Sequence, residues 1–557
     1  MNHRVSGNSD AADLMKKITE TPTRASKIKT NLLSNRNSVK KHNPSEALSI
    51  FVQAELTKQQ YQVIYSANKN VYSCYSLLTK AKKECYPSKD SIVVSETKAE
   101  VKLQSLLDHI SSRLCKYLEE VLQVLSSEEK PNLELISKWG CDGSQQTQFK
   151  QKFENIADSD ANIFQSSCVP IKLIANNHTE KKIIWQNPTP SSTRFCRPIR
   201  IRFVHETADV TLHEIKYIQE QIKTLKETEV PSFHGAVKIR HTLLLTMVDG
   251  KVCNAATGTT STMRCYICGS TSKDVNKLCK DFTENPNTLT FGLSPLQTRI
   301  RFLESILRLS YRIPISIWQA ISKEQKRIVA DTKMNIQKML KDELGLLVDV
   351  PKQGFGTTND GNTSRRFFAE PDTASRITGV NVELIKSLKV ILEAISSGHH
   401  IDETKFHKYA YETAKLYVSL YSWHPMIPTM HKVLLHGAAV FKEAILPIGQ
   451  LSEEAAEARN KHFRMYRTKY SRKFNREVCN RDVLNRLLLT SDPFLSCSTQ
   501  RRRKTTKPYS SETLELLLPE MAEIRSTKRS EDGCDEEAEY NYEEAEENRS
   551  CSSEDSD

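Results

Sequence analysis

The sequence predicts an α/β core combined with large all-α parts. Candidate strands rich in β-branched and aliphatic residues are concentrated in residues 129–253, where a helical segment separates the last two. Long runs with apolar residues at helical spacing fill much of residues 45–128 and 254–449. Because strands that alternate with helices form α/β sheets, residues 129–253 are expected to hold the sheet.

The candidate strands are short and separated by polar segments. They are residues 133–143, 181–186, 197–206 and 237–250. Residues 210–227 have helical spacing and stand before the last of them. We therefore expect residues 129–253 to form the first part of the core and 254–449 to form a helical insertion. Residues 450–499 are expected to supply the last core helix and the C-terminal helices.

Charge is distributed unevenly along the chain of 557 residues. The formal net charge is +12, and Glu531–Asp557 hold thirteen acids and one base, so the remainder carries about +24. A body that basic predicts a polyanionic partner, and double-stranded DNA is the expected one. A lysine-rich surface without a partner is the alternative.

Composition also divides the ends of the chain from its centre. Residues 1–44 contain nine bases and three acids, which is typical of a basic disordered arm. Residues 45–128 are expected to be a helical domain for DNA binding or dimerisation. Residues 500–557, basic and then acidic, are expected to be a disordered tail whose cluster Arg501–Lys504 is a nuclear-localisation signal or a DNA patch.

The 14 cysteines are scattered, so a disulfide framework is not expected. No apolar run approaches the roughly 18 residues that span a membrane. The expected protein is nuclear, with reduced thiols and no membrane contact.

Two aspartates and three glutamates are candidates for a metal-dependent active site. Asp142 and Asp249 each end a candidate strand and precede a glycine, which predicts a position at the rim of the sheet. A simple Asp-Gly turn is the alternative for either one. Glu453, Glu454 and Glu457 open a later helix, and spacing does not choose among them; a solvated acidic first turn is the alternative. Three converging carboxylates would bind two Mg²⁺ or Mn²⁺ ions about 3.5–4 Å apart.

Two further pairs have the spacing of zinc ligands. Cys265 and Cys268 form a C-x2-C pair, and His431 and His436 form an H-x4-H pair. The 162 residues between the pairs exceed the length of a zinc finger, so packed cysteines and surface histidines are the alternative. One structural Zn²⁺ with these four ligands would close the insertion at its base and return Glu457 to the sheet.

In this order, the motifs resemble the Transib transposases and the similar catalytic core of the RAG recombinase. The resemblance covers about residues 130–495, and residues 359–368 and 446–461 look closest to Transib. The motifs that carry it are Cys141–Gly143, Val248–Gly250, Cys265–Cys268, His431–His436 and Glu457–Arg467.

The resemblance implies an RNase H-like catalytic core interrupted by a large, mostly helical zinc-binding insertion. It implies that Asp142, Asp249 and Glu457 bind two Mg²⁺ ions, with Glu457 chosen because the family's glutamate precedes an Asn-Lys pair. The implied activity is that of a DDE-type DNA transposase. Such an enzyme nicks DNA at terminal inverted repeats, forms hairpins on the flanking DNA by transesterification and joins the excised ends to target DNA.

Polar and cationic side chains around such a site are expected to contact DNA, although exposed bases on helices are often only solvated. The candidates are Asn460, Lys461, Arg464, Arg472, Lys473, Arg365 and Arg366. We expect a homodimer that pairs two DNA ends, and the sequence identifies no accessory subunit. Two alternatives stay open: a domesticated DNA-binding or chromatin protein without transposition activity, and a scaffold protein organised by zinc.

Overall fold

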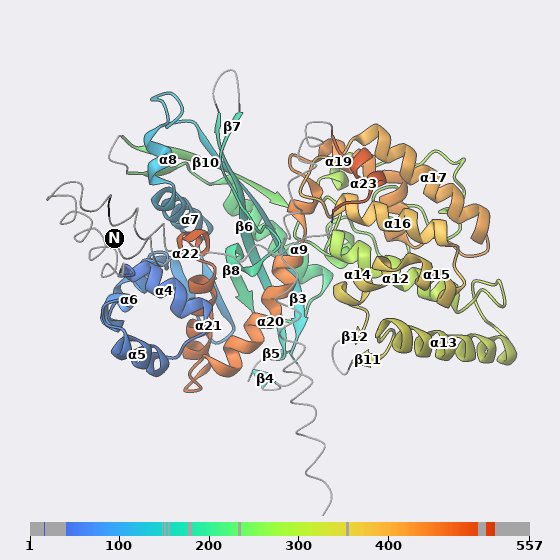
Figure 1. The fold of residues 1–557 in the computed structure, drawn as a ribbon, viewed down its shortest axis with the longest axis horizontal. Helices are drawn as coiled ribbons and strands as arrows, with labels where there is room; N and C mark the ends of the chain where they lie inside the picture. Colours follow the sequence, from blue (N-terminus) through green and yellow to red (C-terminus); the bar gives the residue numbers. More distant parts are fainter. Residues whose placement is uncertain are drawn as a thin grey trace, which may run out of the picture. The chain divides into compact units, whose positions relative to one another are not determined.

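The computed structural model forms two compact units, residues 1–85 and 86–557, which are described separately (Figure 1). The expected basic arm and tail lie almost entirely outside the described residues. The structure describes residues 16, 41–146, 149, 152–153, 156–176, 181–231, 235–352, 356–498 and 508–518.

The described part of the first unit consists of three helices, α4 (Pro44–Gln53), α5 (Lys58–Ala67) and α6 (Tyr75–Lys83). Asn43 and Thr57 start α4 and α5 with capping boxes, in which side chain and backbone satisfy each other's hydrogen bonds. The Tyr61 ring is fully buried against Phe51, and its hydroxyl donates to the Ser73 carbonyl at 2.7 Å. A small aromatic core therefore holds these helices together.

The second unit is built on one mixed sheet, whose strands lie in the order β1-β2-β8-β6-β3-β10-β9, with β7 also paired to β6. β3 and β10 run parallel, and the other paired neighbours are antiparallel. In chain order the strands are β1 (Ile92–Val94), β2 (Lys98–Val101), β3 (Leu133–Gln145), β6 (Asn162–Asn176), β7 (Lys181–Gln186), β8 (Arg197–Arg202), β9 (Thr228–Val230) and β10 (Val237–Leu245). A separate pair, β4 (Lys152–Phe153) and β5 (Ile156–Ser159), lies between β3 and β6 in the chain.

The sheet differs from the sequence-based expectation in two places. β6, the strand between β3 and β8, was not among the expected strands. It contains Pro170, which disfavours an inner strand, and the β3–β6 register shifts next to the Pro170–Ser137 pair. The helical domain expected over residues 45–128 also contains β1, an edge strand of this sheet, and β2, which lies between β1 and β8.

Several helices of the second unit, outside the helical block, lie before, between or after the sheet strands along the chain. Among them are α7 (Leu103–Tyr117), α8 (Glu119–Gln123), α9 (Ala208–Lys223) and, after the helical block, α20 (Glu454–Lys469), α21 (Arg476–Thr490) and α22 (Pro493–Ser498). Buried arginines attach two of them, α7 and α20, to the rest of the unit. Arg113 of α7 forms a two-bond ion pair with Asp492 at 2.9 Å, and Arg459 of α20 donates to the carbonyls of Thr193 and Cys196.

Residues 286–451 form a helical block (Figure 1). Its longest helix, α13, begins at the Ser322 capping box and ends at Gly345, whose φ of 61° closes the helix. The elements of the block are α11 (Pro286–Leu289), α12 (Pro295–Ser310), α13 (Lys323–Leu344), the β11–β12 pair (Pro351–Lys352, Gly356–Thr357), α14 (Gly361–Ala369), α15 (Pro371–Thr378), α16 (Val382–Ile395), α17 (Glu403–Tyr421), α18 (Pro428–His431), η3 (Lys432–His436), α19 (Gly437–Glu443) and η4 (Ile448–Leu451).

Residues 508–518 dock on the helical block and contain α23 (Ser511–Glu515). Glu393 of α16 accepts hydrogen bonds from the hydroxyls of Ser510 at 3.1 Å and Thr513 at 2.8 Å. Leu517 pairs with Ile401 in an antiparallel bridge. This part of the region expected to be a tail is therefore folded.

No helix in the described parts of the chain is long and apolar enough to cross a membrane. The described cysteines are all free thiols, in agreement with the expected absence of a disulfide framework among them.

Candidate active site and candidate metal centre

The candidate active site starts from the parallel pair β3–β10. The amides of Thr246 and Met247, just beyond β10, both donate to the Trp139 carbonyl of β3. A Cβ atom on Gly140 would lie 1.7 Å from the Met247 carbonyl oxygen, so only glycine permits this close approach. The approach brings the end of β10, and with it Asp249, toward Asp142.

The two aspartates occupy different local structures. Asp142 lies within β3 and pairs with Gln165 of β6, because β3 continues to Gln145. The expectation that Asp142 ends a strand is therefore corrected. Asp249 lies four residues beyond β10 and caps α10 (Gly250–Ala256), where its Oδ1 accepts from the amides of Lys251 at 2.9 Å and Val252 at 2.8 Å.

A buried lysine holds the start of α20 against the sheet. The Lys138 side chain of β3 is fully buried, and its Nζ donates to the carbonyls of Gln450 at 2.9 Å and Ser452 at 2.7 Å. A buried ammonium needs such acceptors, since leaving it without hydrogen bonds is costly. Lys138 thereby fixes the turn from which α20 delivers its glutamates.

The structure separates the three candidate glutamates. Glu453 is buried and accepts a hydrogen bond from the Ser294 hydroxyl. Glu454 forms ion pairs with Arg299 at 3.8 Å and Arg365 at 3.3 Å. Glu457 is the glutamate of this group whose charge acts on Asp142.

Burial and neighbouring carboxylates change the acidity of Asp142. Burial, followed by the charges of Asp249, Glu457 and Glu206, raises its pKa from 3.8 to about 8. A hydrogen bond from the Asn460 amide to Asp142 Oδ2, at 2.7 Å, acts in the opposite direction. Several acids thus share one site whose negative charges repel.

Glu206 is a fourth acid of this site that sequence reasoning missed. It follows β8, and a Cβ atom on Gly143 would lie 2.8 Å from its Oε2, so its carboxylate lies against the residue next to Asp142. Burial and then the charge of Asp249 raise its pKa, while Lys251, at 3.5 Å, lowers it. The only sequence signal for Glu206 was that it follows the basic strand β8.

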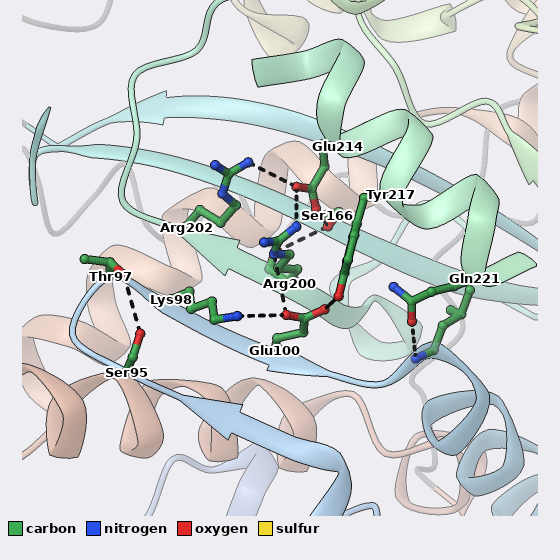
Figure 2. A network of polar contacts seen from close by, with 11 residues as sticks. Ser95, Thr97, Lys98, Glu100, Ser166, Arg200, Arg202, Glu214, Tyr217 and Gln221 are labelled. Atoms are coloured by element: carbon green, nitrogen blue, oxygen red, sulfur yellow. Dashed lines mark hydrogen bonds and ion pairs between the residues drawn. The ribbon is translucent and has the colours of Figure 1, made fainter. Parts of the chain in front are cut away.

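A buried polar network fixes β8 and α9, the elements on either side of Glu206 (Figure 2). Arg200 of β8 lies between two acids, with its Nε 3.6 Å from Glu100 of β2 and its Nη1 3.1 Å from Glu214 of α9. Glu214 also accepts from the Ser166 hydroxyl at 2.8 Å, and the Arg200 guanidinium lies over the Tyr217 ring. Removing one member of a buried ion pair typically costs about 3–5 kcal/mol, so the network holds β2, β6, β8 and α9 together.

This site fits divalent cations by its chemistry. Carboxylate oxygens are the ligands that Mg²⁺ and Mn²⁺ prefer, and the charges of Asp249, Glu457 and Glu206 add to burial in raising the pKa of Asp142. Among the described residues, however, the acids do not converge as closely as the Cys/His group described next. A bound ion would therefore have to draw their oxygen atoms together.

The four expected zinc ligands come together in the structure. The potential ligand atoms of Cys265, Cys268, His431 and His436 all lie within 4.8 Å of one another, and all four residues are buried or half-buried. Cys268 Sγ lies 3.4 Å from His431 Nε2, and hydrogen bonds, first from Cys265, hold the pKa of the Cys268 thiol below its ordinary value. Two thiolates and two imidazoles are a tetrahedral zinc ligand set, so this group could bind a zinc ion.

Local backbone structure explains how each pair faces the site. The Cys265 carbonyl accepts from the Gly269 amide at 2.8 Å, and Gly269 has a φ of 73°, which closes a tight turn around the cysteine pair. Residues 432–436 form the π-helix η3. In an α-helix, side chains five residues apart diverge by about 140°. The wider π turn lets both histidines face the cysteines.

Glu284 supports this group and was not predicted. Its carboxylate lies 2.7 Å from His436 Nδ1, which leaves His436 Nε2 directed to the cluster and without a hydrogen-bond partner. Carboxylates that orient metal-binding histidines are typical of zinc sites. The orphaned nitrogen is an independent indication that the group fits a metal ion.

The expected DNA contacts are dispersed. Asn460 contacts Asp142 and Gln165 rather than open surface. Arg365 pairs with Glu454, and Arg366 donates to the Leu344 carbonyl. Lys461 and Arg464 lie on α20, exposed and half-buried respectively. Beyond α20, the Arg472 side chain forms two hydrogen bonds with Asp482, and Lys473 contacts the Arg467 carbonyl.

Glu453→Gln is expected to change the pH dependence of stability. Burial raises the pKa of Glu453 from 4.5 to about 7. Its contribution to stability is therefore complete below pH 4.5 and is lost as the pH rises through 7, where the buried carboxyl must ionise. We therefore compare the free energy of unfolding of the variant with that of wild type at each pH. The difference, variant minus wild type, should be more positive at pH 8 than at pH 5, by up to roughly 3 kcal/mol. Equal differences at both pH values, measured by calorimetry, would contradict this.

Comparison with known proteins gives one finding for the sheet region. Residues 135–263 match the family model of the Recombination-activation protein 1 (RAG1) RNase H domain. No curated protein matches the chain. The matched stretch begins in β3 and contains Asp142, Glu206 and Asp249. It supports an RNase H-like, RAG1- and transposase-like domain, a class of nuclease that uses divalent metals to act on DNA.

Proposed function

We propose that this chain, whose sheet region is similar to the RAG1 RNase H domain, is a DDE-type DNA transposase or a recombinase derived from one. The observation that carries the proposal is that Asp249 and Glu457, from two other parts of the chain, lie near enough for their charges to raise the pKa of Asp142. In the proposed reaction the enzyme nicks DNA at terminal inverted repeats. The released 3′-hydroxyl then attacks the opposite strand to leave a hairpin on the flanking DNA, and the excised end joins target DNA.

Asp142, Asp249 and Glu457 would bind two Mg²⁺ or Mn²⁺ ions, and Glu206 is positioned to assist. When bound, such ions activate the attacking oxygen and stabilise the leaving oxygen of a phosphodiester. Asn460 would orient Asp142 through their hydrogen bond of 2.7 Å. Lys138 would hold the start of α20 so that Glu457 reaches the phosphate.

The remaining parts of the proposal concern support and partners. Cys265, Cys268, His431 and His436 would bind one structural Zn²⁺ with no open position, closing the helical block at its base. The basic body would bind the repeat ends and the target as a homodimer in the nucleus. Lys461 and Arg464 would contact phosphates, since they follow Glu457 along α20.

The test is a cleavage assay on duplex DNA that carries the inverted repeats flanking the gene. Full-length protein with Mg²⁺ or Mn²⁺ should produce nicks and then hairpins, resolved on denaturing gels. Asp142→Asn should lose both products because the amide removes an anionic ligand. Asp331→Asn, on an exposed carboxylate of α13, is the matched control and should cleave normally.

Two outcomes would contradict the proposal. Cleavage that survives Asp142→Asn would remove the assigned site. Tight DNA binding by the wild-type protein without cleavage in either metal would instead identify a DNA-binding protein that no longer moves DNA.

A further inference from the structure

Phe474 is exposed to an unusual degree. Its side chain is 87% exposed, more than any other large apolar side chain in the described residues. It lies in the short turn between α20 and α21, where neither helix covers the ring. Exposing a phenyl ring to water is unfavourable, so a ring in this position is suited to contact with a partner.

The surroundings of Phe474 are strongly basic. Residues 464–482 contain seven lysines and arginines and two acids, and one of the seven, Arg467, is buried in an ion pair with Asp160. Arg472 lies two residues before Phe474 in the same turn, and its side chain is 71% exposed even while paired with Asp482. A cationic surface attracts a polyanion and disfavours a second copy of itself. We therefore consider nucleic acid rather than protein as the partner of this ring.

One face of α20 connects this turn with the candidate active site. Glu457, Lys461, Arg464 and Thr468 are spaced by four, three and four residues, which places them on one side of a helix. The twelve steps along the helix from Glu457 to Lys469 span about 18 Å at a rise of 1.5 Å per residue. At a DNA rise of about 3.4 Å per base pair, this length corresponds to about five base pairs.

We propose that Phe474 contacts a DNA base about five to six base pairs from the cleaved phosphate. The phosphate backbone would follow the basic face of α20, and the ring would stack on, or wedge beside, a base at the end of that face. A phenyl ring has no hydrogen-bonding group, so the contact would tolerate different sequences. Apolar side chains inserted at a base step unstack it and bend the duplex. This inference rests on the proposed function, because that function places the cleaved phosphate at Glu457.

The test uses binding and fluorescence without cleavage. The probe is a duplex with one pre-made nick that carries a single 2-aminopurine, moved in turn from the third to the ninth base pair beside the nick. Without divalent metal, full-length wild-type protein should change the fluorescence most at about the fifth or sixth position. Phe474→Ala should abolish that change and weaken binding about tenfold. Phe474→Trp should retain both, and Ile321→Ala, at another highly exposed apolar residue, should bind as wild type does.

The outcomes separate this inference from the proposed function. A fluorescence change that is identical in Phe474→Ala would overturn the base contact even if the enzyme cleaves DNA. If Phe474→Ala binds DNA as wild type does but has an altered sedimentation coefficient, the base contact is overturned in favour of a protein contact. A Phe474-dependent signal in a protein that never cleaves would support the contact and refute the proposed function.

Discussion

Glu457→Gln is expected to reduce DNA cleavage by roughly a thousandfold while leaving DNA binding within a few-fold of wild type. The charge of Glu457 acts on Asp142, and Gln keeps the size of the side chain but removes the anionic oxygen that a divalent ion needs. Single-turnover rates on the repeat-end duplex measure the effect, and fluorescence anisotropy measures binding separately.

The neighbouring glutamates are the matched controls for this prediction. Glu453 is hydrogen-bonded by Ser294 and Glu454 is paired with Arg299 and Arg365, so neither should be needed for the chemical step. Glu453→Gln and Glu454→Gln should therefore cleave within about tenfold of wild type. If Glu453→Gln is inactive but folded and Glu457→Gln is active, the assignment of the glutamate is wrong.

Loss of a zinc ligand is expected to have the largest effect on stability. Structural zinc contributes about 10–16 kcal/mol in zinc-finger peptides, which is comparable with the whole stability of a typical domain. Cys265→Ser or strong chelation should therefore unfold the helical block and remove cleavage indirectly. Zinc content by mass spectrometry and the thermal unfolding profile are the measurements.

Two further variants sharpen this experiment. Cys279→Ser changes an exposed free cysteine that is not one of the four candidate ligands and should keep both zinc and stability. Glu284→Gln removes the carboxylate beside His436 and should weaken zinc binding about 10- to 100-fold without abolishing it. A stable, zinc-free Cys265→Ser protein would show that the four residues are not a structural metal site.

The sequence predicted much of the regular structure because its periodicity is strong and local. β3, β7 and α9 lie close to their expected residues, and much of residues 254–449 is helical. β6 escaped prediction because it mixes polar residues such as Gln165 and Ser166 with apolar ones and contains Pro170, which the sheet accommodates beside a register shift. β1 and β2 are too short to stand out against the helices around them.

Pattern and spacing alone identified both candidate sites as sets of residue types. The C-x2-C and H-x4-H pairs already indicated zinc, and the Asp-Gly pairs indicated two of the acids. Spacing could not choose among the three glutamates, and it was the family resemblance that selected Glu457. The residue types of both sites could be found in this way because metal binding depends on side-chain chemistry, which the sequence records directly.

Only the tertiary structure identified the further residues that support the two candidate sites. Glu206 joins the acids because β8 pairs with β6, so that a residue 64 positions after Asp142 lies against Gly143. The turn around Gln450 reaches the sheet because Lys138, 312 residues earlier, hydrogen-bonds to its carbonyl. Glu284 contacts His436 across a separation of 152 residues. Such contacts follow from the packing of distant segments, which no local pattern encodes.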